Sequence, residues 1–459
     1  MKISYPFKKK KDQNHSLTET IIEKVLTLLS SQDNTNLKKL LSSLHSADVA
    51  DVLEQVSKSD RKSILKLLNY DFGVRILVEL SDHVVDEVIS IIPEKKLISF
   101  LNLIEIDDLV NIAENVGETN IKKLFNSLTV QKRNSLEKIL KYDFDTAGRI
   151  MQTQVMTFHD HWNVGEVIDS LRSSHNLPSS FYEIIIVNSS MCPIGIVSLS
   201  KLMSSSRDIS LKSLMKPDFK KINVNQSKED VAYIFNQYHI VSAPVVDSND
   251  ILVGTITVDD AIDILEGETE EDMKRLGGVG DEELSDDVFG IARARLPWLF
   301  ANLLTAIIAS IVIAQFTSTI SSIVALAVLM PIVASMGGNA GTQTLTVAVR
   351  ALATRDLTKA NAGRIVFREL SVGVANGFIF AIVVGLITFY WYDDKHLALI
   401  IGLAMVCNMI MAALSGILLP LGLKKLGADP ALSSSVFVTT VTDVIGFLSL
   451  LWFATFFLI

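Results

Sequence analysis

The stretch Pro331–Arg350, PIVASMGGNAGTQTLTVAVR, decides how this chain is organised. It lies inside a long apolar run and yet carries glycines and polar residues: Gly337, Gly338, Gly341, Asn339, Thr342, Gln343 and Thr344. Hydrocarbon does not tolerate unpaired amides that face lipid, so the segment must be buried in protein or line a water-filled path. The GxxxG spacing of Gly337 and Gly341 is typical of tight helix packing. Packing alone does not explain the polar side chains, and we therefore predict a conduction or binding site.

The chain joins a charged part to an apolar part. Its 459 residues are enough for about three domains. Residues 1–295 are charged and soluble in character, whereas residues 296–459 are mostly apolar. The net charge of -9 argues against a nucleic-acid partner. Cys192 and Cys407 lie far apart and suggest no disulfide framework, which fits a reducing compartment for the soluble part.

Residues 17–145 read as one helix after another, behind a terminus at 1–16 that we expect to be flexible. LHSADVADVLEQV, LSDHVVDEVISII and LIEIDDLVNIAENV form a loose repeat with apolar residues at spacings of three and four. Stacked short helices form an all-α superhelical solenoid. No catalytic constellation is visible, so we predict a regulatory domain and no enzyme. We interpret the acidic side chains as a solvated helix face: Asp48, Asp51, Glu54, Asp82, Asp86, Glu87, Asp107 and Asp108.

Residues 146–268 change to short β-rich runs that alternate with helical stretches, and the pattern repeats after roughly 60 residues. The runs are EIIIVN (183–188), PIGIVS (193–198), APVVD (243–247) and ILVGTITV (251–258). The two copies, about 146–207 and 208–268, resemble tandem CBS domains, which have an α/β fold.

The second of these copies carries a G-h-h-[ST]-x-x-D pattern at Gly254, Thr257 and Asp260. In CBS domains this pattern often touches a nucleotide ribose and phosphate, so the resemblance implies a site for an adenosine nucleotide such as ATP. In the first copy Lys201 replaces the acid, which leaves at most one good half-site. The alternative is that Thr257 and Asp260 only cap the following helix.

The segment 266–287, EGETEEDMKRLGGVGDEELSDD, holds ten acidic residues and only two basic ones, Lys274 and Arg275. A solvated linker is one interpretation. The other is a switch, because carboxylates from separate domains can share a hard divalent cation and repel one another without it. The segment leads directly into the first membrane segment, so its position can bias a pore.

Five apolar segments are long enough to span a membrane. They are about 297–317, 322–349, 365–391, 396–422 and 430–458. Basic residues gather before the first segment, in the second connection and in the fourth. The positive-inside rule therefore places the soluble half in the cytoplasm, and an odd number of spans places the C-terminus outside. Trp298 and Trp391 lie near segment ends, as interfacial anchors do.

The last span contains FVTTVTDVIGF (437–447), in which Asp443 is a carboxylate inside an apolar segment. Thr439 and Thr440 lie one turn earlier on the helix. An intramembrane acid marks an ion or proton path by default, and no span offers a basic partner. Asn376 and Asn408 are open to either interpretation, since each can simply bridge helices.

Together these features resemble the MgtE family of magnesium channels over nearly the whole chain. The most specific motifs are PIVASMGGNAGTQT, DPALSSSVFVTTVTD and the RALAT turn at 350–354. The resemblance implies a homodimer with its pore on the two-fold axis. It implies that Asp443 faces this axis and receives hydrated Mg²⁺. It also implies that cytoplasmic acids bind Mg²⁺ and close the channel, with a connecting helix at 269–295 acting as a plug.

The residues predicted to line the pore or bind the ion are Asp443, Thr439, Thr440, Gly337, Gly338, Asn339 and Gly341. The residues predicted to bind regulatory Mg²⁺ are Asp259, Asp260, Asp263, Glu266, Glu268, Glu270, Glu271, Asp272, Asp51 and Glu54.

The pore residues suit Mg²⁺ on chemical grounds as well. Mg²⁺ dehydrates reluctantly and is usually held through its waters, so one carboxylate per subunit beside hydroxyls and glycine carbonyls suits a large hydrated ion. Two alternatives stay open: a CBS-regulated, proton-coupled transporter of another solute, and a broader transporter of Co²⁺, Mn²⁺ or Ni²⁺. A nucleotide-sensing receptor without transport does not explain Asp443.

Overall fold

The computed structural model describes residues 19–68, 70–80, 82–174, 177–178, 181–279, 288–432 and 435–458. The chain forms two compact units, Met1–Leu265 and Glu266–Ile459, which are described separately below. The terminus predicted to be flexible, 1–16, and the part of the connecting segment at 280–287 lie outside the described residues.

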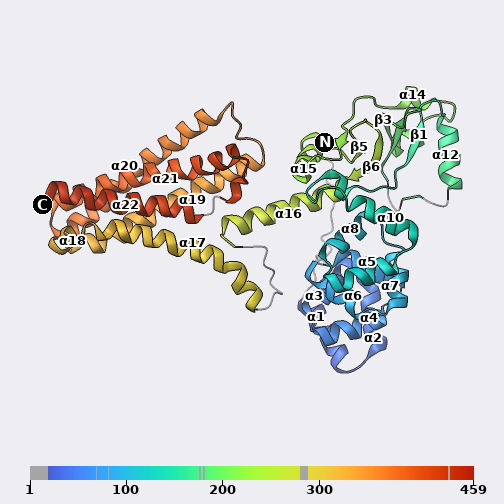
Figure 1. The fold of residues 1–459 in the computed structure, drawn as a ribbon, viewed down its shortest axis with the longest axis horizontal. Coiled ribbons are helices and arrows are strands. Elements are labelled where there is room, and N and C mark those ends of the chain that lie inside the picture. The colour runs from blue at the N-terminus through green and yellow to red at the C-terminus, as the bar shows by residue number, and fades with distance from the viewer. Residues whose placement is uncertain are drawn as a thin grey trace, which may run out of the picture. The chain divides into compact units, whose positions relative to one another are not determined.

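The first unit begins with ten short helices that pack side by side (Figure 1). They are α1 Glu19–Ser30, α2 Asn34–Ser43, α3 Ser46–Gln55, α4 Lys58–Leu67, α5 Tyr70–Glu79, α6 Asp82–Ile91, α7 Glu94–Leu101, α8 Ile106–Asn115, α9 Glu118–Ser127 and α10 Val130–Ile139. Most of them contact the next helix but one, as in α3 with α5, α5 with α7 and α7 with α9. The predicted all-α superhelical domain is therefore confirmed. Its core includes fully buried leucines such as Leu53 and Leu109, each of which contributes roughly 1.5–3 kcal/mol.

Polar side chains close the ends of these helices. Ser57 caps α4 through the backbone N–H of Asp60 at 3.3 Å. At C-terminal ends, Arg61 donates to the carbonyl of Leu53 at 2.7 Å, and Lys123 donates to that of Ile89 at 2.6 Å. Cations suit this position because the helix dipole places partial negative charge there. Several basic side chains of this domain are therefore hydrogen-bonded to backbone carbonyls at helix ends.

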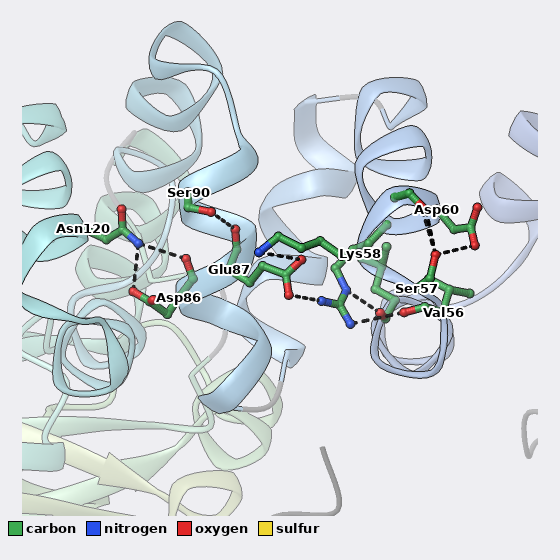
Figure 2. A network of polar contacts seen from close by, with 11 residues as sticks. Val56, Ser57, Lys58, Asp60, Asp86, Glu87, Ser90 and Asn120 are labelled. Carbon is green, nitrogen blue, oxygen red and sulfur yellow. Dashed lines mark hydrogen bonds and ion pairs between the residues drawn. The ribbon is translucent and has the colours of Figure 1, made fainter. Parts of the chain in front are cut away.

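Two of the acids interpreted as a solvated face hold the helices together instead (Figure 2). Asp86 of α6 accepts from the backbone N–H of Gly117 at 2.9 Å and from the side chain of Asn120 at 3.0 Å. Glu87 pairs with the buried Arg61 at 2.6 Å, and Lys58 lies 4.0 Å from its other oxygen. The solvated-face interpretation is wrong for these two residues, because sequence spacing does not show partners from other helices.

The rest of the first unit contains two three-stranded sheets of identical topology. The strands are β1 Thr157–His159, β2 Glu183–Val187, β3 Pro193–Ser198, β4 Ile222–Asn223, β5 Ser242–Val246 and β6 Leu252–Thr257. The helices are α11 Ala147–Ile150, α12 Val164–Ser173, α13 Leu199–Ser204, α14 Leu211–Leu214, α15 Lys228–Tyr238 and the beginning of α16 Val258–Leu276, which continues into the second unit. In each sheet the first strand pairs in parallel with the second, which pairs antiparallel with the third. The predicted α/β repeat is confirmed.

The segment that precedes each sheet pairs with a strand of the other sheet. Gln152, which precedes the first sheet, bridges to Thr255 of β6, and Lys216, which precedes the second sheet, bridges to Ile196 of β3. Gly254 makes this close approach feasible, because an added Cβ would lie 2.8 Å from the carbonyl oxygen of Gln152.

The second unit contains the apolar helices, which run side by side (Figure 1). They are α17 Val288–Ala314, α18 Thr317–Ser322, α19 Ala325–Ala353, α20 Ala362–Tyr392, α21 Lys395–Lys425, the 3₁₀ turn η1 Pro430–Leu432 and α22 Ser435–Leu458. All except α18 and η1 are long and apolar enough to span a membrane, which confirms the five predicted spans. Helix α21 is central, since it packs against α19, α20 and α22.

The connecting region differs from its predicted bounds. Helix α16 begins at Val258, directly after β6, and ends at Leu276, where Gly278 has a left-handed φ of 67°. Helix α17 begins at Val288, earlier than the predicted start of the first span. A single helix over 269–295 is therefore wrong. The glycine pair at 277–278 ends α16 because Gly adopts positive φ without strain.

Candidate ion path and acidic clusters

The glycines of the opening stretch pack α19 against its neighbours. A Cβ added at Gly338 would lie 3.3 Å from Cγ2 of Thr439 on α22, and one at Gly337 would lie 2.7 Å from Cγ of Asn408 on α21. Helix α19 continues without interruption through these residues. The carbonyl oxygen of Gly338 also accepts a hydrogen bond from Thr342 Oγ1 at 2.7 Å. The glycines therefore bring helices together, and α19 remains helical through them.

Three polar residues of α19 lie on a different face from the glycines. Ser335, Asn339 and Gln343 are spaced by four residues and are all exposed, whereas Gly337, Gly338 and Gly341 are buried. Residues four apart lie on one face of an α-helix. An apolar spanning helix thus presents one polar face, which cannot lie against lipid.

Asp443 lies near the centre of the last span and is partly exposed. Its carboxylate has no hydrogen bond or ion pair to the residues that the structure describes. One turn earlier, Thr439 Oγ1 donates to the carbonyl of Ser435 at 2.9 Å, and Thr440 Oγ1 donates to that of Val436 at 2.6 Å. Both hydroxyl oxygens retain acceptor capacity. The contact between Thr439 and Gly338 brings this face of α22 beside α19.

A second group of acids lies in the first unit, where the first turn of α8 faces the first turns of α16. Burial, followed by the charges of Asp108 and Glu105, raises the pKa of Asp107 to about 7. Burial, followed by Glu105 and Asp260, raises the pKa of Asp108 to about 7. Burial likewise raises the pKa of Asp260 to about 7, against the lowering effect of its hydrogen bonds from Thr257. We call Asp107, Asp108 and Asp260 the N–CBS acid cluster.

The N–CBS acid cluster corrects our interpretation of Asp107 and Asp108 as a solvated face. Oδ1 of Asp107 is buried and has no hydrogen-bond partner among the described residues. The sequence signal was weak, because Asp260 lies far along the chain from both. The only local hint is that paired acids open both helices, as IDD in α8 and VDD in α16.

The residues predicted to hold a nucleotide contact one another. Asp260 Oδ2 accepts from the backbone N–H of Thr257 at 2.8 Å and from its hydroxyl at 2.7 Å. Gly254 is closely packed against Met151. In the first copy, Lys201 Nζ donates to the carbonyl of Leu214 at 2.7 Å. These contacts between Thr257 and Asp260 match the alternative in which the two residues cap the helix that follows, α16.

The end of α16 lies in the second unit and has basic partners. Glu270 pairs with Lys274 at 2.9 Å, and Glu271 pairs with Arg275. Arg275 also pairs with Asp429, which immediately precedes η1. Burial, followed by the charge of Asp429, raises the pKa of Asp272, while Arg275 acts in the opposite direction. We call Glu271, Asp272, Asp429 and Arg275 the α16 end cluster.

Apolar contacts accompany the α16 end cluster. Leu276 packs against Leu345 and Val349 of α19 and Val438 of α22. The last turn of α16 is therefore seated on the ends of the two helices that carry Asp443 and the glycines.

The other predicted regulatory acids are more exposed. Asp259, Asp263 and Glu266 on α16 are exposed, and Glu268 is partly exposed. Asp51 on α3 is exposed, and partial burial followed by Glu54 and Asp48 raises its pKa. Across the described ranges, no group of three or more His, Cys, Asp or Glu side chains is arranged to hold a metal ion directly. The acids therefore do not form a preformed inner-sphere cage.

Comparison with known proteins supports this arrangement. Three family descriptions match: "MgtE: Divalent cation transporter" at residues 330–453, "MgtE intracellular N domain" at 44–145, and "CBS domain" at 147–208 and 211–267. A magnesium transporter MgtE of Enterococcus faecalis is 32% identical over 68% of this chain and 69% of its own length. One of Bacillus subtilis is 27% identical over 97% and 99%, and one of Thermus thermophilus is 29% identical over 91% and 94%.

A solved structure is similar to the soluble part. The crystal structure of the cytosolic domain of the Mg²⁺ channel MgtE in complex with ATP has a TM-score of 0.50 and 24% identity. It covers 53% of this chain and 99% of that chain. This likeness concerns the fold alone.

The spanning helices, the paired CBS domains and the matching descriptions define a membrane transporter with large soluble domains. The chain belongs to the MgtE family of divalent cation transporters. The relatives found are named as transporters rather than enzymes.

Proposed function

We propose that this protein conducts Mg²⁺ across a lipid bilayer, along a path beside Asp443. The observation that carries the proposal is a carboxylate inside a spanning helix with no partner among the described residues. An ionisable side chain at such a position marks an ion path by default. The Mg²⁺ assignment is supported by the relatives, which are named magnesium transporters.

The chemistry of the path favours a hydrated ion. Mg²⁺ gives up its waters reluctantly and binds proteins through few carboxylates. Asp443 supplies a single charge, and Thr439 and Thr440 supply hydroxyl oxygens one turn away that can accept from the ion's water shell. Binding of this kind is weak enough to let the ion leave, which conduction requires.

The protein acts as a homodimer in this proposal, with the path on the two-fold axis. The exposed polar face of α19, at Ser335, Asn339 and Gln343, supports a partner copy because it is unsuited to lipid. Two copies would place two carboxylates around one path. The soluble domains lie in the cytoplasm and the C-terminus outside, because Arg350, Lys424 and Lys425 lie at the ends of α19 and α21.

Cytoplasmic Mg²⁺ closes the channel in this proposal. The N–CBS acid cluster holds carboxylates whose strongest charged neighbours are other acids, so a hydrated cation would relieve their repulsion. The end of α16 is seated on α19 and α22 within the second unit. Helix α16 carries Asp260 in its first turn and Arg275 in its last turn, and so gives a continuous connection from the acids to the pore domain. Within the first unit, the exposed acids Asp51, Asp259 and Asp263 and the partly exposed Glu54 would add further ligands, and within the second unit the exposed Glu266 and the partly exposed Glu268 would do so.

ATP binding to the CBS pair is a separate proposal. It is supported by the ATP complex of the similar cytosolic domain and by the pattern Gly254, Thr257 and Asp260. We expect the nucleotide to compete with the hydrogen bonds between Thr257 and Asp260. Calorimetric titration of the soluble domains with ATP tests the idea, and Thr257→Val should lower the affinity. Equal binding by that variant would reject this location.

The conduction proposal is tested by Mg²⁺ uptake into vesicles that contain the purified protein. Asp443→Ala should lose uptake while the protein still folds and dimerises. The matched control is Ser449→Ala in the same helix, because among the described residues Ser449 Oγ bonds only within the helix, to the carbonyl of Gly446 at 3.1 Å. Uptake by Asp443→Ala at the wild-type rate would contradict the proposal. Uptake that follows a pH gradient and is indifferent to internal Mg²⁺ would favour the proton-coupled alternative.

A further inference from the structure

Asn408 lies where α19, α21 and α22 meet. Its side chain extends from α21 and is fully buried, and Nδ2 donates to the carbonyl of Val333 on α19 at 2.7 Å. A Cβ added at Gly446 of α22 would lie 2.9 Å from the same nitrogen. One added at Gly337 of α19 would lie 2.7 Å from Cγ of Asn408. The backbones of two helices therefore enclose one amide.

The orientation of this amide is fixed by chemistry. The carbonyl of Val333 can only accept, so the nitrogen of Asn408 faces it and Oδ1 faces elsewhere. Oδ1 is buried and has no hydrogen-bond partner among the described residues. A buried acceptor without a partner destabilises a fold. An apolar side chain of the same shape would remove this penalty, so stability alone does not account for an asparagine here.

The contacts around Asn408 reach α22 close to the proposed ion-binding acid. Gly446 follows Asp443 by three residues on α22, and Thr439 precedes it by four. On α19, Gly337 contacts Asn408, and the next residue, Gly338, contacts Thr439. A shift of α19 relative to α22 would therefore change the surroundings of Asp443 directly.

We propose that Asn408 is a positioning residue for ion conduction. Its hydrogen bond to Val333 and its close fit between Gly337 and Gly446 set the separation of α19 and α22, and so hold Thr439 and Asp443 at the distance that a hydrated ion requires. The proposal rests on the conduction site at Asp443.

The test compares two shape-matched substitutions that each remove a buried polar atom without a partner. Asn408→Leu removes the amide, and Thr388→Val removes the hydroxyl of Thr388, which is also fully buried and unpaired among the described residues. Thr388 lies on α20, which carries none of the proposed ion-path residues. Mg²⁺ uptake into vesicles is measured over a range of Mg²⁺ concentrations, together with the thermal midpoint of each purified protein.

Asn408→Leu should reduce uptake by about tenfold, less than the roughly hundredfold loss that a 1 Å misplacement of a reacting centre can cause. Its half-saturating Mg²⁺ concentration should rise, while its thermal midpoint stays at or above the wild-type value. Thr388→Val should conduct normally. Normal uptake and normal half-saturation in Asn408→Leu would overturn the inference, and so would a loss of uptake accompanied by a lower thermal midpoint.

Asp443→Ala is measured in the same series to separate the two claims. If Asp443→Ala loses uptake and Asn408→Leu does not, only the positioning role of Asn408 fails. If Asp443→Ala conducts normally, the ion site itself fails.

Discussion

Asp443 and the N–CBS acid cluster are opposite arrangements of carboxylates. Asp443 is a single carboxylate beside hydroxyls in a spanning helix, with no charged partner among the described residues. The cluster brings Asp107, Asp108 and Asp260 together, and each carboxyl has a pKa of about 7 because burial and acidic neighbours disfavour its charge. A lone charge holds a hydrated ion weakly and lets it pass, whereas crowded charges gain more from a bound ion and suit sensing.

The α16 end cluster adds a third case, in which the chain supplies its own cation. Arg275 pairs with both Glu271 and Asp429, so its guanidinium already offsets the charge of these carboxylates. This cluster should therefore depend less on Mg²⁺ than the N–CBS acid cluster does.

The largest expected effect concerns the lone charge. Asp443→Asn keeps the shape of the side chain and removes its charge, and it should lower Mg²⁺ uptake by roughly a hundredfold, equivalent to about 2.7 kcal/mol. Thr440→Val removes only a hydroxyl and should lower uptake much less. Uptake into vesicles at saturating Mg²⁺ measures both. Equal losses in the two variants would show that the charge has no special role.

The second prediction separates sensing from conduction. Replacing Asp107, Asp108 and Asp260 by Asn should leave uptake at low internal Mg²⁺ unchanged and raise the Mg²⁺ concentration needed for inhibition by about tenfold, or about 1.4 kcal/mol. Replacing Glu270 and Glu271 by Gln should shift inhibition less, because Lys274 and Arg275 already pair with them. If the Glu270 and Glu271 variant raised the inhibiting Mg²⁺ concentration more than the Asp107, Asp108 and Asp260 variant, the α16 end cluster would be the main sensor instead.

The sequence was sufficient for the five spans and for the position of Asp443 inside the last one, because an acid in an apolar run is visible without any partner. It was insufficient for Asp107 and Asp108, whose buried state depends on Asp260 in a distant segment. It also left the glycines of α19 open between helix packing and a place in the ion path, because both uses of glycine look alike in sequence; the structure shows their packing contacts. The start of α17 was missed because Arg293 and Arg295 interrupt its apolar pattern.

The third prediction concerns pH in the absence of divalent cations. The folded-state pKa values of about 7 lie above the ordinary aspartate value of 3.8, so the folded form binds more protons than the unfolded form between these pH values. Stability therefore falls as pH rises toward 7 and stays reduced above it. The soluble fragment that ends at Leu265 should gain thermal stability from pH 8 to pH 6, by ~2–4 °C for each kcal/mol relieved.

Two controls sharpen the pH experiment. Saturating Mg²⁺ should shrink the pH dependence, because the cation stabilises the charged carboxylates. The Asn variant of all three residues should remove it. A fragment that loses stability on acidification to pH 6 would contradict the assigned pKa directions.

The smallest expected effect concerns Arg275. Arg275→Gln leaves Glu271, Asp272 and Asp429 without their guanidinium, so their repulsion should loosen the end of α16 from α19 and α22. Inhibition should then require a few-fold more internal Mg²⁺, about 0.5–1 kcal/mol, as expected for partly exposed ion pairs. The matched control is Lys274→Gln, which breaks the neighbouring pair with Glu270. Equal shifts in the two variants would remove the special role of Arg275.

The most direct test of separate conducting and sensing sites is a Mg²⁺ titration from each face of the membrane, with the protein oriented in one direction in vesicles. Mg²⁺ on the face opposite the soluble domains should increase flux until it saturates. Mg²⁺ on the face of the soluble domains should suppress that flux, and the Asn variant of Asp107, Asp108 and Asp260 should weaken the suppression without lowering the maximal flux. Identical responses to Mg²⁺ from the two faces would contradict the account.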